Sequence, residues 1–277
     1  MTRGPRVRRT HRFRGRRAPG LIRAAAVIAL TLLVLPIVAL VVRVPWPEFG
    51  TLLTAPATME ALVLSLGTAI VATTCALILG VPLAVLMAEA ATWPVIPRRL
   101  LRAAVTIPLI LPPVVGGIAL LALLGRRGIV GQWLAEAGLG IPYTPAAVVI
   151  AQVFVAMPFL VLAVEGALNS VDRRVEQAAA SLGAGPGQVF RTVTLPLVAP
   201  GISAGAVLCF ARALGEFGAT ITFAGSLPGV TRTLPVASYL AMQSDPAEAI
   251  VLALLLLVVA IAVLLALRDR WTPGIRG

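Results

Sequence analysis

Six long apolar stretches dominate this chain of 277 residues. A transmembrane helix needs about 20 predominantly apolar residues, and only 12% of this chain is charged, against about 25% in a soluble domain. The sequence therefore predicts an all-α, polytopic membrane protein with about six transmembrane helices. The predicted spans are approximately 24–42, 61–86, 103–124, 146–164, 197–224 and 249–267.

The arginines are spread unevenly over the connections between these spans. All 23 basic residues are arginine, and 18 of them lie in the two termini and in the segments 98–102 and 173–191. The alternate connections hold only four, and the pair Arg126 and Arg127 is the one discordant detail. Because basic segments stay on the cytoplasmic side, we expect a multi-pass protein of the cell membrane with both termini in the cytoplasm. The first apolar run is predicted to be a retained helix, since no small-x-small cleavage pattern follows it.

Several function classes find no support in the composition. Nine arginines precede the first span, where lipid headgroups would hold them, and no groove-reading element accompanies them to indicate nucleic-acid binding. Cys75, Cys209 and His11 are far apart, so no metal site is predicted. A Walker A loop needs a lysine, and the chain has none. We therefore expect no catalytic site in this chain and no cofactor bound by it.

The segment between the fourth and fifth spans carries the most specific pattern. Residues 172–182 are rich in alanine and other helix formers. Gly183 and the following Gly-Pro-Gly cluster should end this helix, and a second short helix should begin near Pro186. A short helix with a smooth alanine face suits docking into a groove of another protein. An amphipathic loop lying on the bilayer explains the same residues equally well.

The residues of this segment resemble the EAA loop of ABC importer permeases. Gln177-Ala178-Ala179 is followed at the family's spacing by Gly183, Val193 and Leu195-Pro196. The name EAA-type loop is used below for residues 171–197. Gln177 departs from the family's glutamate, although Glu176 precedes it directly. The resemblance implies that this loop couples the permease to an ATPase through Glu176, Gln177, Ala178, Ala179, Leu182, Gly183 and Phe190.

The fifth span contains charged residues inside an apolar run. Arg212 and Glu216 are four residues apart, which predicts one helix face, with Thr220 one turn further on. Charges within a membrane face a partner, the bundle interior or a water-filled path, so these residues either line the translocation pathway or form a structural pair that fixes packing. We favour the structural pair over direct ligand contact, because Glu216 cancels the charge that would attract an anion.

Other spans contain residues that shape helices. Pro112 and Pro113 interrupt the third span, which could make it a kinked, gate-lining helix or merely a bent packing helix. Gly201 and Gly205 form a small-xxx-small pattern that allows close helix packing.

The stretch from Ala211 to Gly225, with residues 227–239, is similar to the molybdate branch of the oxyanion permeases. The resemblance implies a type I ABC importer fold, a homodimer, two ABC ATPase subunits that use ATP and Mg²⁺, and an extracellular oxyanion-binding protein. Tungstate is a possible second substrate. The alternatives are a sulfate or thiosulfate permease and a membrane scaffold or passive channel. The expected domains are a basic tail (1–23), a first helix with its external loop (24–55) and the permease domain (56–268).

Overall fold

The computed structural model describes residues 19–268, and these residues form helices and no strand. They fall into two units, one ending at Arg43 and the other beginning at Val44. The first unit contains α1 (Gly20–Val42), which is apolar on all sides, as expected of a helix surrounded by lipid.

The second unit is a bundle built on three long helices. α3 (Pro56–Glu89) and α10 (Leu195–Leu214) both pack against α7 (Pro145–Ser170). The core between them consists largely of small residues, among them Ala69, Ala72 and Ala76 of α3. A Cβ atom at Gly205 would lie 3.0 Å from Leu160 Cδ1, so α10 and α7 approach each other closely, as helices do in membranes. A Cβ atom at Gly201 would collide with Ala167 of the same helix α7.

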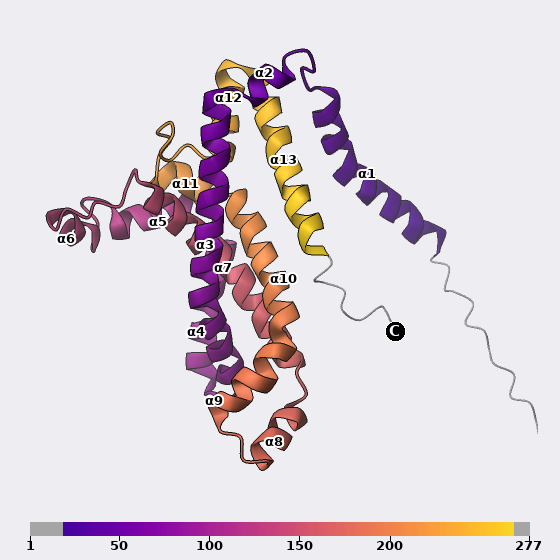
Figure 1. Ribbon diagram of the computed structural model, residues 1–277, viewed down its shortest axis with the longest axis vertical. Coiled ribbons are helices and arrows are strands. Elements are labelled where there is room, and N and C mark those ends of the chain that lie inside the picture. The colour runs from indigo at the N-terminus through magenta and orange to yellow at the C-terminus, as the bar shows by residue number, and fades with distance from the viewer. Residues whose placement is uncertain (1–18, 269–277) are drawn as a thin grey trace, which may run out of the picture. The chain divides into compact units, whose positions relative to one another are not determined.

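Shorter elements occupy the two ends and one side of this bundle (Figure 1). At one end lie η1 (Ala90–Thr92), the start of α4 (Val95–Ile110), α8 (Arg173–Ser181) and α9 (Pro186–Val189). At the other end lie α2 (Phe49–Leu53) and α12 (Leu234–Ser244), which packs against α13 (Pro246–Arg268). To one side lie α5 (Pro113–Leu124), α6 (Gly131–Glu136) and α11 (Gly218–Phe223).

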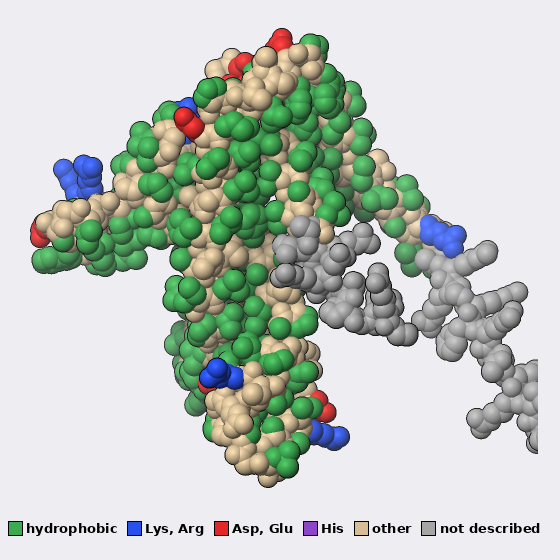
Figure 2. Space-filling view, viewed as in Figure 1, with side chains coloured by type: hydrophobic (Ala, Val, Ile, Leu, Met, Phe, Trp, Pro, Cys, Tyr) green, Lys and Arg blue, Asp and Glu red, His purple; other side chains and the backbone are tan. Residues whose placement is uncertain are grey.

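The number of spans agrees with the sequence prediction. Among residues 19–268, five helices are long and apolar enough to cross a membrane, and the pair α4 and α5 would make a sixth. The visible face of the long helices is mainly hydrophobic, and charged side chains gather toward their ends (Figure 2). Such a surface suits lipid along its middle and water at its ends.

Two predicted spans are broken in the structure. The third was predicted over 103–124 with its helical ladder interrupted at Pro112 and Pro113, and the chain does bend there, by 116° between α4 and α5. Pro112 and Pro113 explain this break, because proline lacks the N–H that would continue the helical ladder. The fifth was expected to be continuous over 197–224, but it is interrupted between Leu214 and Gly218.

Candidate functional site

The EAA-type loop begins with a well-capped helix. Asp172 caps α8, and its Oδ1 accepts a hydrogen bond of 2.9 Å from the backbone N–H of Arg174. The helix closes at Gly183, whose φ of +92° favours glycine. The N–H groups of Gly183 and Ala184 donate to the carbonyls of Ala180 and Ala179 over 3.0 and 3.2 Å. This double closure is a Schellman motif, so the predicted helix and its stop at Gly183 are confirmed.

The second half of the loop is continuous with a long helix. α9 begins at Pro186, as predicted, and passes through a π-helical turn, η2 (Phe190–Thr194), into α10. Together these elements form one helix of 29 residues from Pro186 to Leu214. At a rise of 1.5 Å per residue it is roughly 43 Å long.

A hydrogen bond joins the two halves of the loop. The hydroxyl of Thr194, in η2, donates to Oε1 of Glu176, in α8, over 2.5 Å. Thr194 is buried, and Glu176 is half-buried beside it. The short distance is normal for a hydroxyl that donates to a carboxylate. Glu176 therefore points inward.

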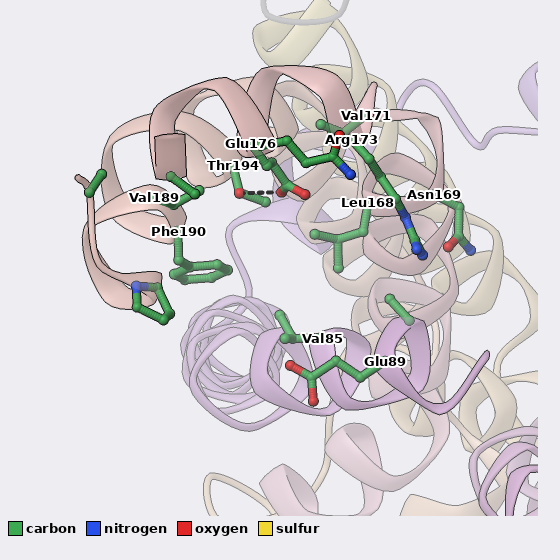
Figure 3. A pocket seen from close by; sticks show the side chains of 15 residues that line it. Val85, Glu89, Leu168, Asn169, Val171, Arg173, Glu176, Val189, Phe190 and Thr194 are labelled. Carbon is green, nitrogen blue, oxygen red and sulfur yellow. Dashed lines mark hydrogen bonds between the residues drawn. The ribbon is translucent and has the colours of Figure 1, made fainter. Parts of the chain in front are cut away.

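A cavity of about 640 Å³ separates the loop from the ends of α3 and α7 (Figure 3). Apolar side chains such as Val85, Leu168 and Phe190 line much of it, and Glu89 and Arg173 add charge. α8 packs mainly against α9 and η2. The loop is therefore attached to the bundle chiefly through its own second half.

The residues predicted to couple to an ATPase fall into two groups in the structure. Glu176, Gln177 and Phe190 line the cavity, and Gln177 is also exposed. Ala178 and Gly183 face solvent, Ala179 is half-buried, and Leu182 is 90% exposed. The exposed apolar Leu182 directly follows the end of α8.

A second group of polar residues lies where the fifth span breaks. The name elbow is used below for Gly215–Phe217, between α10 and α11. Glu216 is 1% exposed; its Oε2 lies 2.6 Å from Nη2 of Arg212, and its Oε1 accepts a hydrogen bond of 2.8 Å from the N–H of Ala219. The prediction of one continuous helix face was wrong, because α10 ends at Leu214. The two residues nevertheless form an ion pair around the elbow.

The elbow is held against the break in the third span. A Cβ atom at Gly218 would lie 2.9 Å from Cβ of Pro113, and one at Gly117 would lie 2.7 Å from Cβ of Thr222. α11 therefore packs tightly on α5, and the two predicted features lie side by side. Thr220 is buried in α11, whereas Pro112 and Pro113 are largely exposed.

Two polar contacts on α7 were missed by sequence reasoning. Glu165, buried in α7, pairs with Arg102 of α4, and Gln152 donates to Thr68 of α3 over 3.2 Å. Glu165 directly follows the predicted span 146–164 but lies inside α7, and an ionisable residue so close to a span is a signal that it has a partner. Within residues 19–268, no cluster of three or more His, Cys, Asp or Glu residues could hold a metal ion.

The helices and the loop define a class: a multi-pass membrane protein with a largely exposed helical loop at one end. Residues 80–277 match the family model for the binding-protein-dependent transport system inner membrane component. The chain belongs to this family, and it is a permease subunit located in the cell membrane.

Individual relatives agree with this family. The molybdenum transport system permease protein ModB of Mycobacterium tuberculosis (strain ATCC 25618 / H37Rv) is 49% identical over 249 residues, covering 90% of this chain and 93% of the relative. A probable sulfate transport system permease protein, cysT of Nephroselmis olivacea, is 32% identical over 242 residues, covering 86% and 84%. A crystal structure of a bacterial ABC transporter involved in alginate import shares the fold, with a TM-score of 0.67 and 18% identity over 92% and 96% of the two chains. The fold is therefore that of an ABC importer permease.

Proposed function

We propose that this chain is the translocation subunit of an ATP-driven importer for molybdate. The observation that carries the proposal is the 49% identity to a molybdenum permease over 90% of the chain. The relative named as a sulfate permease is less similar, at 32% identity. Tungstate has nearly the same size and charge as molybdate, so we expect it to compete.

The proposed assembly contains several further chains. Two copies of this subunit form the pathway, an ABC ATPase docks under each EAA-type loop, and an extracellular binding protein delivers the oxyanion. The exposed side of α8, with Ala178 and Leu182, supports docking at this loop. The sequence contains no lysine for a Walker A motif, so the partner ATPase uses the ATP and Mg²⁺. The arginine distribution supports cytoplasmic termini, and the permease domain is proposed to span residues 56–268.

The mechanism proposed for this assembly is alternating access. ATP-driven closure of the two ATPases displaces the EAA-type loops, and the cavity along the dimer axis changes from inward-facing to outward-facing. The two states differ in their contacts with nucleotide-bound ATPase, which supplies the free-energy difference between them. Arg212 and Glu216 brace this pathway near the elbow and do not contact the anion directly, since the ion pair is neutral.

The first experiment compares cellular molybdenum in a strain that lacks this chain and in the same strain complemented with it. At nanomolar molybdate we expect complementation to restore uptake. Excess tungstate should block this uptake and excess sulfate should not. Inhibition by sulfate would move the chain to sulfate import, and no difference between the strains would favour a scaffold.

A second experiment tests the docking role of the EAA-type loop. Replacement of Gly183 by Leu should abolish ATP-dependent uptake, because a side chain at φ +92° distorts the end of α8. Gly187→Leu is the matched control, since the site is equally open but has no positive φ. Normal uptake by the Gly183→Leu variant would contradict a coupling role for this loop.

A further inference from the structure

We propose that Glu176 is a positioning residue that fixes α8 to the long helix Pro186–Leu214 through Thr194. The proposal rests on the function proposed above and assigns Glu176 a role inside the subunit. A contact with a cation on the ATPase would be the alternative role for an acidic residue in this loop.

The chain segment that links α8 to the long helix is flexible. It passes through Gly183 and Gly185, and a Cβ atom at either residue would have no neighbour within 4 Å. Glycine gives the chain more conformational freedom than any other residue. Without another restraint, a push on α8 would turn this short helix about residues 183–185 and leave α10 in place.

The packing around α8 offers little restraint from the rest of the bundle. The cavity of about 640 Å³ lies between the loop and the ends of α3 and α7, so α8 can shift without displacing either helix. α9, η2 and α10, in contrast, form one uninterrupted helix. A firm attachment of α8 to η2 would therefore direct a push on α8 along α10.

The hydrogen bond from Thr194 to Glu176 provides this attachment. It joins residues 18 apart in the chain, and Thr194 is only 6% exposed, so water competes poorly for its hydroxyl. Hydrogen bonds to charged groups are among the stronger ones in proteins. Figure 3 shows Glu176 turned toward Thr194, with Phe190 and Val189 on the same wall of the cavity. Glu176 thus acts on transport through Thr194.

The test uses the complete transporter, with its ATPase and binding protein, reconstituted in liposomes. The measured quantity is molybdate taken up per ATP hydrolysed. Glu176→Ala and Thr194→Val should each lower this ratio about tenfold, the effect expected for losing a hydrogen bond to a charged group. The double variant should be no worse than either single variant, because both remove the same interaction.

Two conservative variants separate the alternatives. Glu176→Gln keeps an acceptor for the Thr194 hydroxyl but loses the charge, and Thr194→Ser keeps the hydroxyl. Both should retain most of the coupling ratio. Failure of Glu176→Gln alongside normal behaviour of Thr194→Val would overturn the proposal in favour of a charge contact with the ATPase. Additive losses in the double variant would also overturn it.

Hydrogen exchange on the same complexes gives a readout that does not depend on the transported ion. Thr194→Val should speed amide exchange across α8 by about tenfold while the amides of α7 keep their protection. If the wild-type complex imports no molybdate, the proposed function fails, and exchange in α8 still tests the hydrogen bond. Unchanged exchange in α8 would overturn the positioning role even when transport is normal.

Discussion

The two ends of the long helix Pro186–Leu214 are built in opposite ways. At the EAA-type loop, α8 is largely exposed, is followed by the 90% exposed Leu182 and lies beside a cavity of about 640 Å³. At the elbow, Glu216 is 1% exposed, and α11 packs so closely on α5 that two glycines are needed at the contact. One helix therefore joins an open end to a tightly packed one.

This difference has a mechanical consequence. A close-packed junction has no free volume into which its atoms can move, so it passes a displacement on to its neighbours. A loop beside a cavity can shift at little cost. Changes at the elbow should therefore affect the stability of the whole subunit, whereas changes at the EAA-type loop should act locally and appear mainly in coupling.

The largest effect is expected from removing the basic partner at the elbow. Arg212→Met would leave the carboxylate of Glu216 buried without its counter-charge, which costs about 3–5 kcal/mol in free energy of unfolding. Thermal unfolding in detergent would measure this loss. The double variant Arg212→Met/Glu216→Gln should recover most of it.

The matched control is the ion pair between Arg102 of α4 and Glu165 of α7, which lies toward the loop end of the bundle, where Asn169 lines both its surroundings and the cavity beside the EAA-type loop. The side chain of Arg102 is 57% exposed, against 27% for Arg212, so water can reach the place that Arg102 leaves and solvate Glu165. Arg102→Met should therefore cost less. An equal or greater loss for Arg102→Met would break the contrast between a buried elbow and an open loop end.

A smaller effect is expected where α5 and α11 touch. A Cβ atom at Gly117 would lie 2.7 Å from Cβ of Thr222 and 3.0 Å from the carbonyl oxygen of Ala219. Gly117→Ala should therefore destabilise the subunit by about 1–3 kcal/mol through overpacking. Gly67→Ala in α3 is the control, because its Cβ would meet no atom within 4 Å and alanine favours the helix. The close-packed elbow would be refuted if both variants melted alike.

The sequence predicted one end of the long helix better than the other. The secondary structure of the EAA-type loop is determined by local sequence. An aspartate that can cap a helix, an alanine-rich stretch and a glycine that can end the helix follow one another in the chain. Residue types alone do not show which side of α8 faces the bundle and which faces solvent. Glu176 and Gln177 are neighbours in the sequence, yet Glu176 points toward Thr194. That choice depends on where η2 lies, which is a tertiary contact.

The elbow could not be predicted from the sequence, because the segments on both sides of it are apolar. A hydropathy pattern cannot separate one continuous helix from two helices joined by a short turn, and Glu216 looked like an i, i+4 partner of Arg212. In the structure its carboxylate also accepts the N–H of Ala219 at the start of α11, so it stabilises the break. The size of the bend between α4 and α5, 116°, likewise depends on packing, although the prolines mark its position in the sequence.

The next prediction concerns the stop of α8. Gly183→Ala places a side chain at φ +92° and should cost about 1–2 kcal/mol, confined to the Schellman motif. Hydrogen exchange at Gly183 and Ala184 should accelerate while the melting temperature stays unchanged. Gly187→Ala is the control, with equal space and no positive φ. A fall in melting temperature as large as that of Gly117→Ala would show that the loop end is as tightly integrated as the elbow.

The smallest effect is expected at the start of α8. Asp172→Ala removes the acceptor for the N–H of Arg174 and should weaken the helix by about 1 kcal/mol. Because α8 has only nine residues and short helices are marginal on their own, exchange should rise along the whole helix. Asp245→Ala removes a similar cap from α13, whose 23 residues pack against α12, so only its first turn should respond. A rise confined to the first turn of α8 would mean that the contact with η2, more than its own cap, keeps this helix folded.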